Sequence, residues 1–157
     1  MPPRLAPFKI APDAYSAMRG LEQYVRQSGL EHSLLELVKL RASYMNGCAY
    51  CIDMHSKDAR AKGETEQRIY SVPVWRETPF YTARERAALA WSEAVTDLGH
   101  AGVPDAVYDE ARKHFSDVEL VSLTMAIVAI NGWNRLMVAF QTEPGTYQRA
   151  STPPVAT

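Results

Sequence analysis

The sequence predicts an all-α protein, and three observations lead to this prediction. No stretch of five or more residues alternates apolar and polar side chains, so no strand is expected. Apolar residues recur instead at helical spacing, in segments separated by Gly and Pro. Two Ser/Thr-x-x-Glu sequences, Thr82 to Glu85 and Ser116 to Glu119, have the form of capping boxes, which open helices.

The first half of the chain divides into four expected helices. The first begins after Pro12 or Asp13 and ends at Ser28-Gly29, because Gly commonly terminates a helix. The second covers about 31–45 and is interrupted by Asn46-Gly47. The third begins at or near Cys48 and ends at Lys62-Gly63, and a short fourth helix covers about 64–70.

The second half begins with an expected loop, residues 71–81, which contains two prolines. The first capping box opens a helix over about 82–97, and Pro104 suits the first turn of the next helix, which ends near residue 114. The second capping box opens a long apolar helix to about Phe140, with a disturbance expected near Gly132.

The chain has 157 residues, which is the size of one domain, and we expect a single domain over 1–157. Its core is expected over about 13–145, between a loose N-terminal arm and a loose C-terminal tail. Pro144-Gly145 should stop the last helix, and the tail should begin near residue 146.

Composition and charge exclude several classes of protein. The formal charge of -1 provides no basic surface for a nucleic acid. The N-terminus lacks the apolar run of a signal peptide, so a cytoplasmic location is expected. The apolar run Val118 to Ile130 is shorter than the roughly 20 residues that span a bilayer, so it predicts a core helix rather than a membrane anchor. Its apolar face is extensive enough to indicate burial between subunits.

The chain contains two cysteines, Cys48 and Cys51, with His55 four residues further on. Residues three and four apart share one face of a helix, so all three side chains can line one stripe. A helix that starts at Cys48 places that thiol in the first turn, where the helix dipole stabilises a thiolate. The two sulfurs are close enough to form a disulfide, and His55 can accept or relay a proton.

Three interpretations of this site remain open on the residues alone. The cysteines can be a redox pair, which needs nothing further and is favoured, or two buried thiols that act as small apolar residues. A metal site would need a fourth ligand beside Cys48, Cys51 and His55. The candidates for that ligand are Glu36, His32, His100 and His114. A thioredoxin-type fold is disfavoured because the expected β-α-β surroundings are missing.

Glu36 has two possible roles. It lies twelve residues before Cys48, and a helical hairpin at Asn46-Gly47 would fold it back toward the cysteines, where a carboxylate can orient an imidazole. Alternatively, Glu36 completes a capping box that starts at Ser33. The spacing does not decide between these roles.

The segment LLELVKLRASYMNGCAYCIDMHSKDARAKG resembles the core of the AhpD-like alkylhydroperoxidases, within the carboxymuconolactone decarboxylase superfamily. The pattern E-x11-C-x2-C-x3-H is matched by Glu36, Cys48, Cys51 and His55. The segments TARERAALAWSEAVT and AINGWNRLMVAF are similar to later helices of this family, so the resemblance covers roughly residues 15 to 145.

The resemblance implies an AhpD-like helical bundle that assembles as a homotrimer or homohexamer. It also implies a thiol-dependent alkyl hydroperoxide reductase. In that activity Cys51 attacks the peroxide, Cys48 resolves the sulfenic acid, and Glu36 and His55 relay protons. Dipole reasoning favours Cys48 as the thiolate, but His55 lies on the Cys51 side. No bound cofactor is expected, and the partners are an organic hydroperoxide and a thiol reductant protein, such as one with a dihydrolipoyl group.

The sequence departs from the family at Tyr50, where better-studied members have a histidine, so a polar member of the relay is replaced. Five aromatic residues are candidates for a hydroperoxide pocket, although core positions are the commoner role: Tyr44, Tyr50, Trp75, Trp91 and Trp133.

Two alternative functions stay open. One is a non-enzymatic zinc-binding or redox-sensing oligomeric module. The other is a decarboxylase or lyase that uses His55 and Glu36, against which the cysteine pair counts, because the superfamily's decarboxylases lack it.

Overall fold

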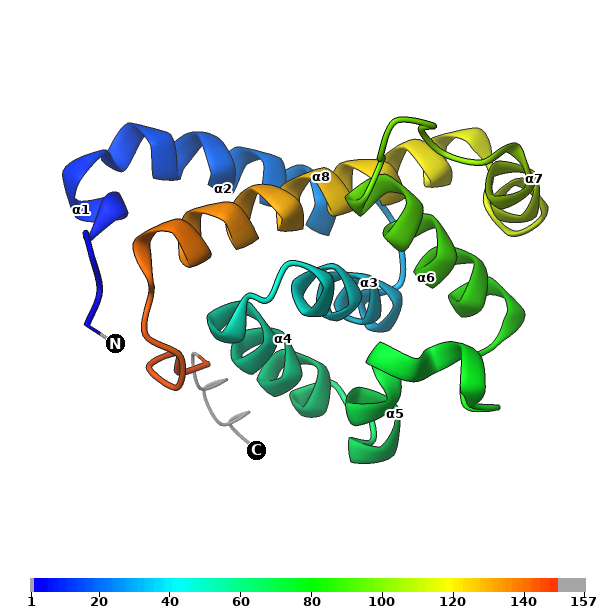
Figure 1. The fold of residues 1–157 in the computed structure, drawn as a ribbon, viewed down its shortest axis with the longest axis horizontal. Helices are drawn as coiled ribbons and strands as arrows, with labels where there is room; N and C mark the ends of the chain where they lie inside the picture. The colour runs from blue at the N-terminus through cyan, green and yellow to red at the C-terminus, as the bar shows by residue number, and fades with distance from the viewer. Residues whose placement is uncertain (1, 150–157) are drawn as a thin grey trace, which may run out of the picture.

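The computed structural model describes residues 2–149, and this part of the chain is all-helical, without a strand (Figure 1). The predicted all-α class is confirmed. The helices are α1 Pro7–Ile10, α2 Pro12–Arg26, α3 His32–Met45, α4 Ala49–Ala61, α5 Glu66–Ser71, the 3-10 helix η1 Val72–Glu77, α6 Ala83–Thr96, α7 Asp105–His114 and α8 Asp117–Phe140.

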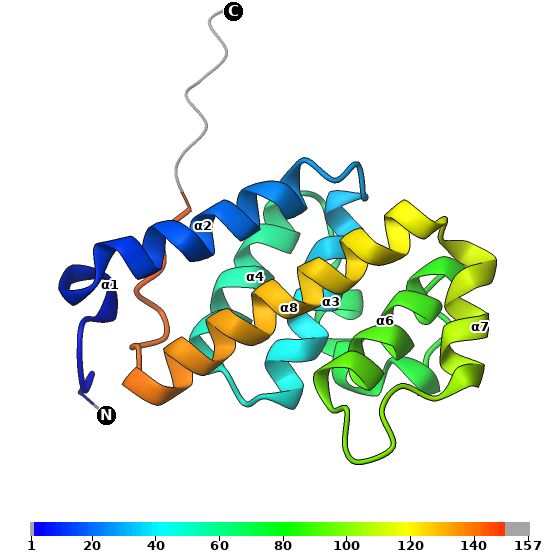
Figure 2. The ribbon, with the colours of Figure 1, turned by 90° about the horizontal axis from the view of Figure 1, so that it is seen from above.

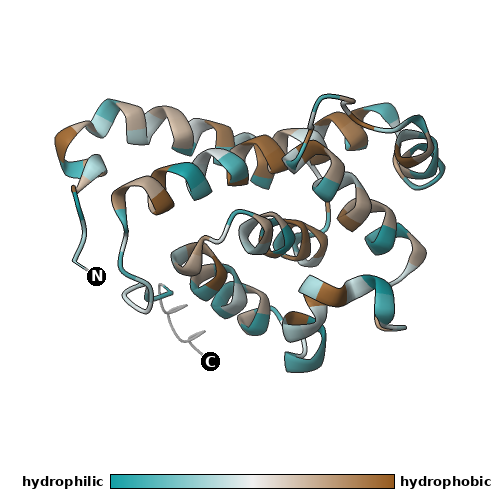
Figure 3. Cartoon of the chain, in the orientation of Figure 1, coloured by the Kyte–Doolittle hydropathy of each residue, from teal (hydrophilic) through white to brown (hydrophobic). Residues whose placement is uncertain are grey.

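Helix α3 is the centre of the fold, and it packs against α4, α6 and α8 (Figures 1 and 2). Every residue from Leu34 to Leu40 is buried, because neighbours surround this helix on several sides. Helix α2 lies along α8, and α7 packs on α6. Figure 3 shows apolar segments along α3 and α8, as expected for helices that form the core.

Both predicted capping boxes are present. The Thr82 hydroxyl accepts a hydrogen bond from the Glu85 backbone N–H, and the Glu85 carboxylate accepts one from the backbone N–H of Thr82. Ser116 and Glu119 make the same reciprocal pair at the start of α8. These boxes are local in sequence, which explains why they could be predicted without tertiary information.

The predicted loop over residues 71–81 begins instead with the 3-10 helix η1. Pro73 lies in its first turn, where the missing N–H of proline removes no helical hydrogen bond. Trp75 is buried, and its Nε1 donates to Glu93 Oε1 of α6 at 2.7 Å. This hydrogen bond to α6, together with the burial of Trp75, holds the segment in a helical turn.

Helix α8 continues through Gly132, so the predicted disturbance is absent from this described helix. A Cβ at Gly132 would lie 2.9 Å from Met18 Cε, so the glycine lets α2 pack closely on α8. The helix ends at Phe140, four residues before Pro144-Gly145, because Gln141 adopts a left-handed conformation with φ 52°.

Within residues 2–149, α8 is long and apolar enough to cross a bilayer by length and composition, a test that core helices also pass. In this fold it packs against α2, α3 and α6. Val118, Val121 and Val128 of α8 are exposed, and their burial between subunits stays a prediction.

Both ends of the described range, residues 2–149, contact the helices. The expected loose arm contains α1, and the backbone N–H of Arg4 donates to the carbonyl oxygen of Phe140 at 3.0 Å. The expected loose tail was placed from residue 146 onward. Its described part, residues 146–149, contacts α4, and residues 150–157 lie outside the described range.

Candidate active site

A tight turn between α3 and α4 assembles the candidate site. Asn46 ends α3, Gly47 has a φ of 64°, and the Cys48 backbone N–H donates to the Ser43 carbonyl oxygen at 2.9 Å. Only glycine adopts this left-handed conformation without strain. Glu36 lies ten residues before Asn46 and His55 nine residues after it, so the hairpin brings the two side chains together.

Cys48 and Cys51 form a disulfide, with their Cα atoms 5.3 Å apart. Cys48 is the N-cap residue of α4, and its Sγ accepts a hydrogen bond from the Cys51 backbone N–H at 3.3 Å. Cys51 therefore also lies in the first turn, so the helix dipole acts on both sulfurs and not on Cys48 alone. The bonded pair favours the redox interpretation over two free apolar thiols.

Glu36 and His55 form a buried hydrogen-bonded pair. The distance from Glu36 Oε2 to His55 Nδ1 is 2.8 Å, and both residues are buried. Burial alone would raise the pKa of the Glu36 carboxyl, but the hydrogen bond and charge of His55, with the charges of Lys39 and Lys62, outweigh burial and lower it. The carboxylate form is thus favoured beside the imidazole.

The hairpin settles the local role of Glu36. The N-cap residue of α3 is Glu31, so the alternative capping box from Ser33 to Glu36 does not form. The His55 Nδ1 atom is occupied by Glu36, which leaves Nε2 as the ring nitrogen available for proton transfer. His55 and Cys51 are four residues apart on α4 and share one face of that helix.

Asp58 joins this pair, although the sequence analysis did not single it out. Ligand atoms of Glu36, His55 and Asp58 all lie within 4.8 Å of one another. Asp58 follows His55 by three residues and so shares its helix face, a signal that could have identified it. The hydroxyl of Tyr147 donates to Asp58 Oδ1 at 2.9 Å. Burial, followed by the hydrogen bond to Asp58, raises the pKa of Tyr147 to about 12.

We call residues 145–149 the C-terminal strap. Besides the Tyr147 hydroxyl, three polar contacts hold it on α4, one of which is an ion pair between Arg149 Nε and Asp58 Oδ1 at 3.9 Å. Lys57 Nζ donates to the Tyr147 carbonyl oxygen at 3.1 Å, and the Gly145 backbone N–H donates to Asp53 Oδ2 at 3.2 Å. Lys57 and Asp53 also pair with each other. The strap is thus fixed beside the Glu36–His55 pair.

The sulfur atoms lie in a different environment. Their apolar cluster consists of buried Ala42, Cys48, Cys51, Ile130 and Met137, with the partly buried side chains Phe8, Tyr50, Trp133 and Leu136 packed against it. Of the five aromatic candidates, Tyr50 and Trp133 therefore lie at the cysteines. Burial raises the pKa of the Tyr50 hydroxyl.

The other three aromatic candidates are part of the packing elsewhere. Trp75 is buried in a cluster with α5 and α6 residues, and Tyr44 packs against that cluster. Trp91 belongs to the cluster between α3, α6 and α8. These side chains take the core role that aromatic residues usually have.

A polar network fixes the turn before Cys48. Asn46 Nδ2 donates to the Oδ1 atoms of Asn131 and Asn134, both at 2.9 Å. Asn134 is fully buried, and its Nδ2 donates to Ser43 Oγ at 3.0 Å. Helix α8 thereby determines the position of the turn that carries the first cysteine.

Among the four candidates for a fourth metal ligand, Glu36 is the one that the described structure brings against His55. His114 lies on α7, with Nε2 3.3 Å from Glu110 Oε1. His32 and His100 are exposed. With Cys48 and Cys51 in a disulfide, the structure brings no set of four ligands together among residues 2–149.

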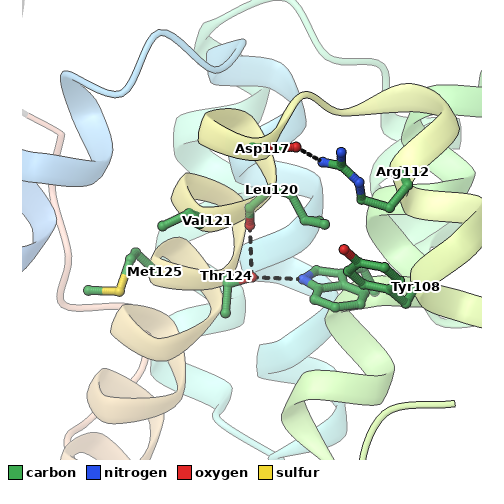
Figure 4. Close-up of a pocket in the computed structure, with 8 residues that line it drawn as sticks. Tyr108, Arg112, Asp117, Leu120, Val121, Thr124 and Met125 are labelled. Atoms are coloured by element: carbon green, nitrogen blue, oxygen red, sulfur yellow. Dashed lines mark hydrogen bonds and ion pairs between the residues drawn. The ribbon is translucent and has the colours of Figure 1, made fainter. Parts of the chain in front are cut away.

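A separate pocket of about 400 Å³ lies between α6, α7 and α8 (Figure 4). Its lining includes Trp91, whose Nε1 donates to Thr124 Oγ1 at 3.0 Å, and an ion pair between Arg112 and Asp117. Met125, the α8 residue of this lining nearest to Trp133 in sequence, precedes it by eight residues, about 12 Å along a helix axis. The pocket is therefore distinct from the cysteine site.

Comparison with known proteins identifies the family. Residues 12–94 match the model of the carboxymuconolactone decarboxylase family. The chain belongs to this family. The uncharacterized protein YdfG of Bacillus subtilis is 45% identical over 139 residues, which are 88% of this chain and 95% of YdfG.

Solved structures place this carboxymuconolactone decarboxylase family member among AhpD-like proteins. A crystal structure from Agrobacterium tumefaciens has 48% sequence identity and a TM-score of 0.90, and the match covers 93% of this chain and all of that chain. That protein is of unknown function, and the assignment AhpD, an antioxidant defence protein, has been suggested for it.

The debrominase Bmp8 has the same fold. Its TM-score is 0.79 at 21% identity, over 88% of this chain and 75% of Bmp8. At that identity the likeness concerns the fold alone. Since proteins of different activity share this fold, the reaction has to be argued from the site.

Proposed function

We propose that the protein is a thiol-dependent alkyl hydroperoxide reductase that uses the Cys48–Cys51 pair. The observation that carries the proposal is the disulfide at the N-terminus of α4, with His55 one turn after Cys51 on the same helix and hydrogen-bonded to the buried Glu36 of α3. A helix N-terminus lowers the pKa of a thiol, and a neighbouring imidazole can move its proton. A second cysteine protects the sulfenic acid from further oxidation.

The reaction has three steps. The Cys51 thiolate attacks the terminal oxygen of the hydroperoxide ROOH. The O–O bond breaks, Cys51 becomes a sulfenic acid, and RO⁻ takes a proton and leaves as the alcohol ROH. The Cys48 thiol then attacks the Cys51 sulfur, so the disulfide forms and water leaves. An external dithiol finally reduces the disulfide and is itself oxidised to a disulfide.

His55 and Glu36 move the protons in these steps. His55 accepts the Cys51 proton and returns a proton to the leaving alkoxide, with a water between groups where they do not touch. Glu36 holds the ring through Nδ1 and stabilises the protonated imidazole. Cys51 is assigned the attack because it shares a helix face with His55. Tyr50 replaces a histidine of better-studied family members.

The proposal includes the expected partners. A protein dithiol, such as a dihydrolipoyl group, regenerates the pair, and no bound cofactor takes part. The protein works as a homotrimer or homohexamer in the cytoplasm, without nucleic acid or membrane partners.

The test begins with fully reduced protein from which the reductant has been removed. Cumene hydroperoxide is titrated in while free thiols are counted and intact mass is recorded. The wild type should lose both thiols and two hydrogens per peroxide. Cys48→Ser should trap an oxygen on Cys51, and Cys51→Ser should not consume peroxide. Tyr108→Phe, in the separate pocket, serves as the control and should match the wild type.

Other results would redirect the assignment. If the folded wild type ignores peroxide but exchanges disulfides with dithiols, it is a disulfide oxidoreductase or redox sensor. A stoichiometric zinc content in the reduced protein would favour the metal-holding module. Activity on a carboxylic acid that survives Cys48→Ser and Cys51→Ser would favour the lyase.

A further inference from the structure

The two sulfurs are closed off from solvent. Cys48 and Cys51 are each 1% exposed, and four side chains from three helices pack against their cluster. A peroxide or a reductant must touch a sulfur atom to react, so one of these side chains has to move. The side chain whose helix is held most weakly should move most easily.

Helix α1 is the weakest support among the elements that cover the cysteines. It has four residues, and none of these four described residues is buried. By contrast, Trp133 and Leu136 lie on the 24-residue α8, and Tyr50 lies on α4 between the cysteines themselves. Phe8 is therefore the covering side chain that can leave with the least disruption of the fold.

Phe8 packs against two rings that contact each other and remain when it leaves. Its ring centroid is 4.6 Å from that of Tyr15 and 5.7 Å from that of Trp133. The centroids of Tyr15 and Trp133 are 5.9 Å apart, in an edge-to-face arrangement. Tyr15 belongs to α2 and Trp133 to α8, and these two helices pack along each other. Moving α1 thus exposes a pair of rings on rigid supports.

We propose that Phe8 is a displaceable cover of the cysteine pair, and that the space its ring occupies against Tyr15 and Trp133 receives the apolar group of the hydroperoxide. The second half of this statement rests on the proposed function. When the terminal oxygen of ROOH contacts Cys51, the R group extends away from the sulfur and enters the space of the cover. An apolar or aromatic R group replaces the contacts of Phe8, whereas hydrogen peroxide has no group that can do so.

The cover is tested without any peroxide. The oxidised protein, which is the state of this structure, is treated with the phosphine TCEP, and the rate of disulfide reduction is measured for three chains. Phe8→Ala should react about fivefold faster than the wild type, the effect of losing one aromatic contact of average strength. Leu5→Ala, in the same arm and 52% exposed, should react like the wild type. Equal rates for Phe8→Ala and wild type, with the fold retained by circular dichroism, overturn the cover.

The apolar subsite is tested by competition between substrates. Rates of oxidation of the reduced protein are compared for cumene hydroperoxide and hydrogen peroxide. The preference is the ratio of the oxidation rate with cumene hydroperoxide to that with hydrogen peroxide. Phe8→Ala should lower this ratio because its reaction with hydrogen peroxide is faster. Trp133→Leu should lower it because its reaction with cumene hydroperoxide is slower. An unchanged preference in both variants overturns the subsite. If neither peroxide reacts, both the subsite and the proposed function are wrong. The TCEP rates still show whether Phe8 covers the cysteine pair.

Discussion

The two halves of the site are both buried along α4, but they lie in different chemical environments. The sulfur half contains Cys48 and Cys51 in the first turn of α4, and apolar and aromatic side chains surround it. The proton half contains His55 and Asp58 further along the same helix, facing Glu36. The N-terminal arm covers the first half with a phenyl ring, and the C-terminal strap covers the second with a tyrosine hydroxyl.

This difference shows how one helix can hold two environments that would interfere if they were mixed. A thiolate needs few competing charges around it once the helix N-terminus stabilises it. A proton relay needs partners for every buried charge, because an unpaired one is costly. Spacing the two groups by one helical turn keeps His55 within reach of Cys51 and keeps the carboxylates beside His55 instead of beside the sulfurs.

The largest expected effect comes from removing the charge of Glu36, the carboxylate that is hydrogen-bonded to His55. Glu36→Gln keeps the size of the side chain but cannot stabilise a protonated His55. We expect the rate of Cys51 oxidation by cumene hydroperoxide to fall about a thousandfold, the middle of the range for general acid–base catalysis. Stopped-flow kinetics measure this rate. Glu110→Gln on α7 is the control, and a Glu36→Gln rate within threefold of wild type would remove Glu36 from the relay.

The next effect concerns the turn that joins the two halves. Asn134→Ala removes a fully buried side chain that accepts from Asn46 and donates to Ser43. We expect the free energy of unfolding to fall by about 3 kcal/mol, because buried partners lose their hydrogen bonds. Urea denaturation measures the change. Val138→Ala, on the exposed side of α8, should cost less than about 0.5 kcal/mol, and an equal loss in both variants would contradict this role of the network.

A smaller effect depends on pH. The pKa of Glu36 is lowered in the folded protein from its ordinary value of 4.5. Its carboxylate therefore contributes stability above pH 4.5, and this contribution is lost as the pH falls through the folded pKa. At neutral pH the free energy of unfolding of the wild type should exceed that of Glu36→Gln by about 2 kcal/mol, which is the contribution of a hydrogen bond to a charged group. The gap should narrow below pH 4.5 in urea titrations. A gap that is independent of pH would show that the charge of Glu36 is not involved.

The smallest effect is at the strap. Tyr147→Phe removes the hydroxyl that donates to Asp58 and should cost about 1 kcal/mol of stability. Because the strap and the arm cover different halves, its effect and that of Phe8→Ala should add in the double variant. Unfolding free energies of the two single variants and the double variant measure the sum. A deviation of more than about 0.5 kcal/mol would mean that the two covers are coupled.

The parts of the site that could be predicted depend on residues close in sequence. The stripe of Cys48, Cys51 and His55 follows from helical spacing, and Gly47 marks the turn that brings Glu36 back to His55. Asp58 lies three residues after His55 and so shares its helix face, but it was not predicted because it is not part of the Cys-x-x-Cys-x-x-x-His pattern. Its partner Tyr147 is separated from it by 89 positions, so spacing carries no information about their contact.

The N-terminal arm was expected to be loose, and α1 was not predicted. Pro7 lies in the first turn of α1, where a missing N–H removes no hydrogen bond, as Pro12 does in the predicted helix α2. The position of Phe8 against the cysteines depends on the packing of α2 on α8, which Gly132 permits. Such contacts follow from tertiary structure and not from local pattern.

The placement of the three tryptophans has an optical consequence. Trp133 packs against the cluster that contains the disulfide, whereas Trp75 and Trp91 belong to two other clusters. A disulfide beside an excited indole accepts an electron and quenches its fluorescence. We therefore expect reduction of Cys48–Cys51 to brighten Trp133 and to leave the emission of the other two indoles unchanged. The native chain would then report the state of its sulfur atoms through its own emission, without an added label.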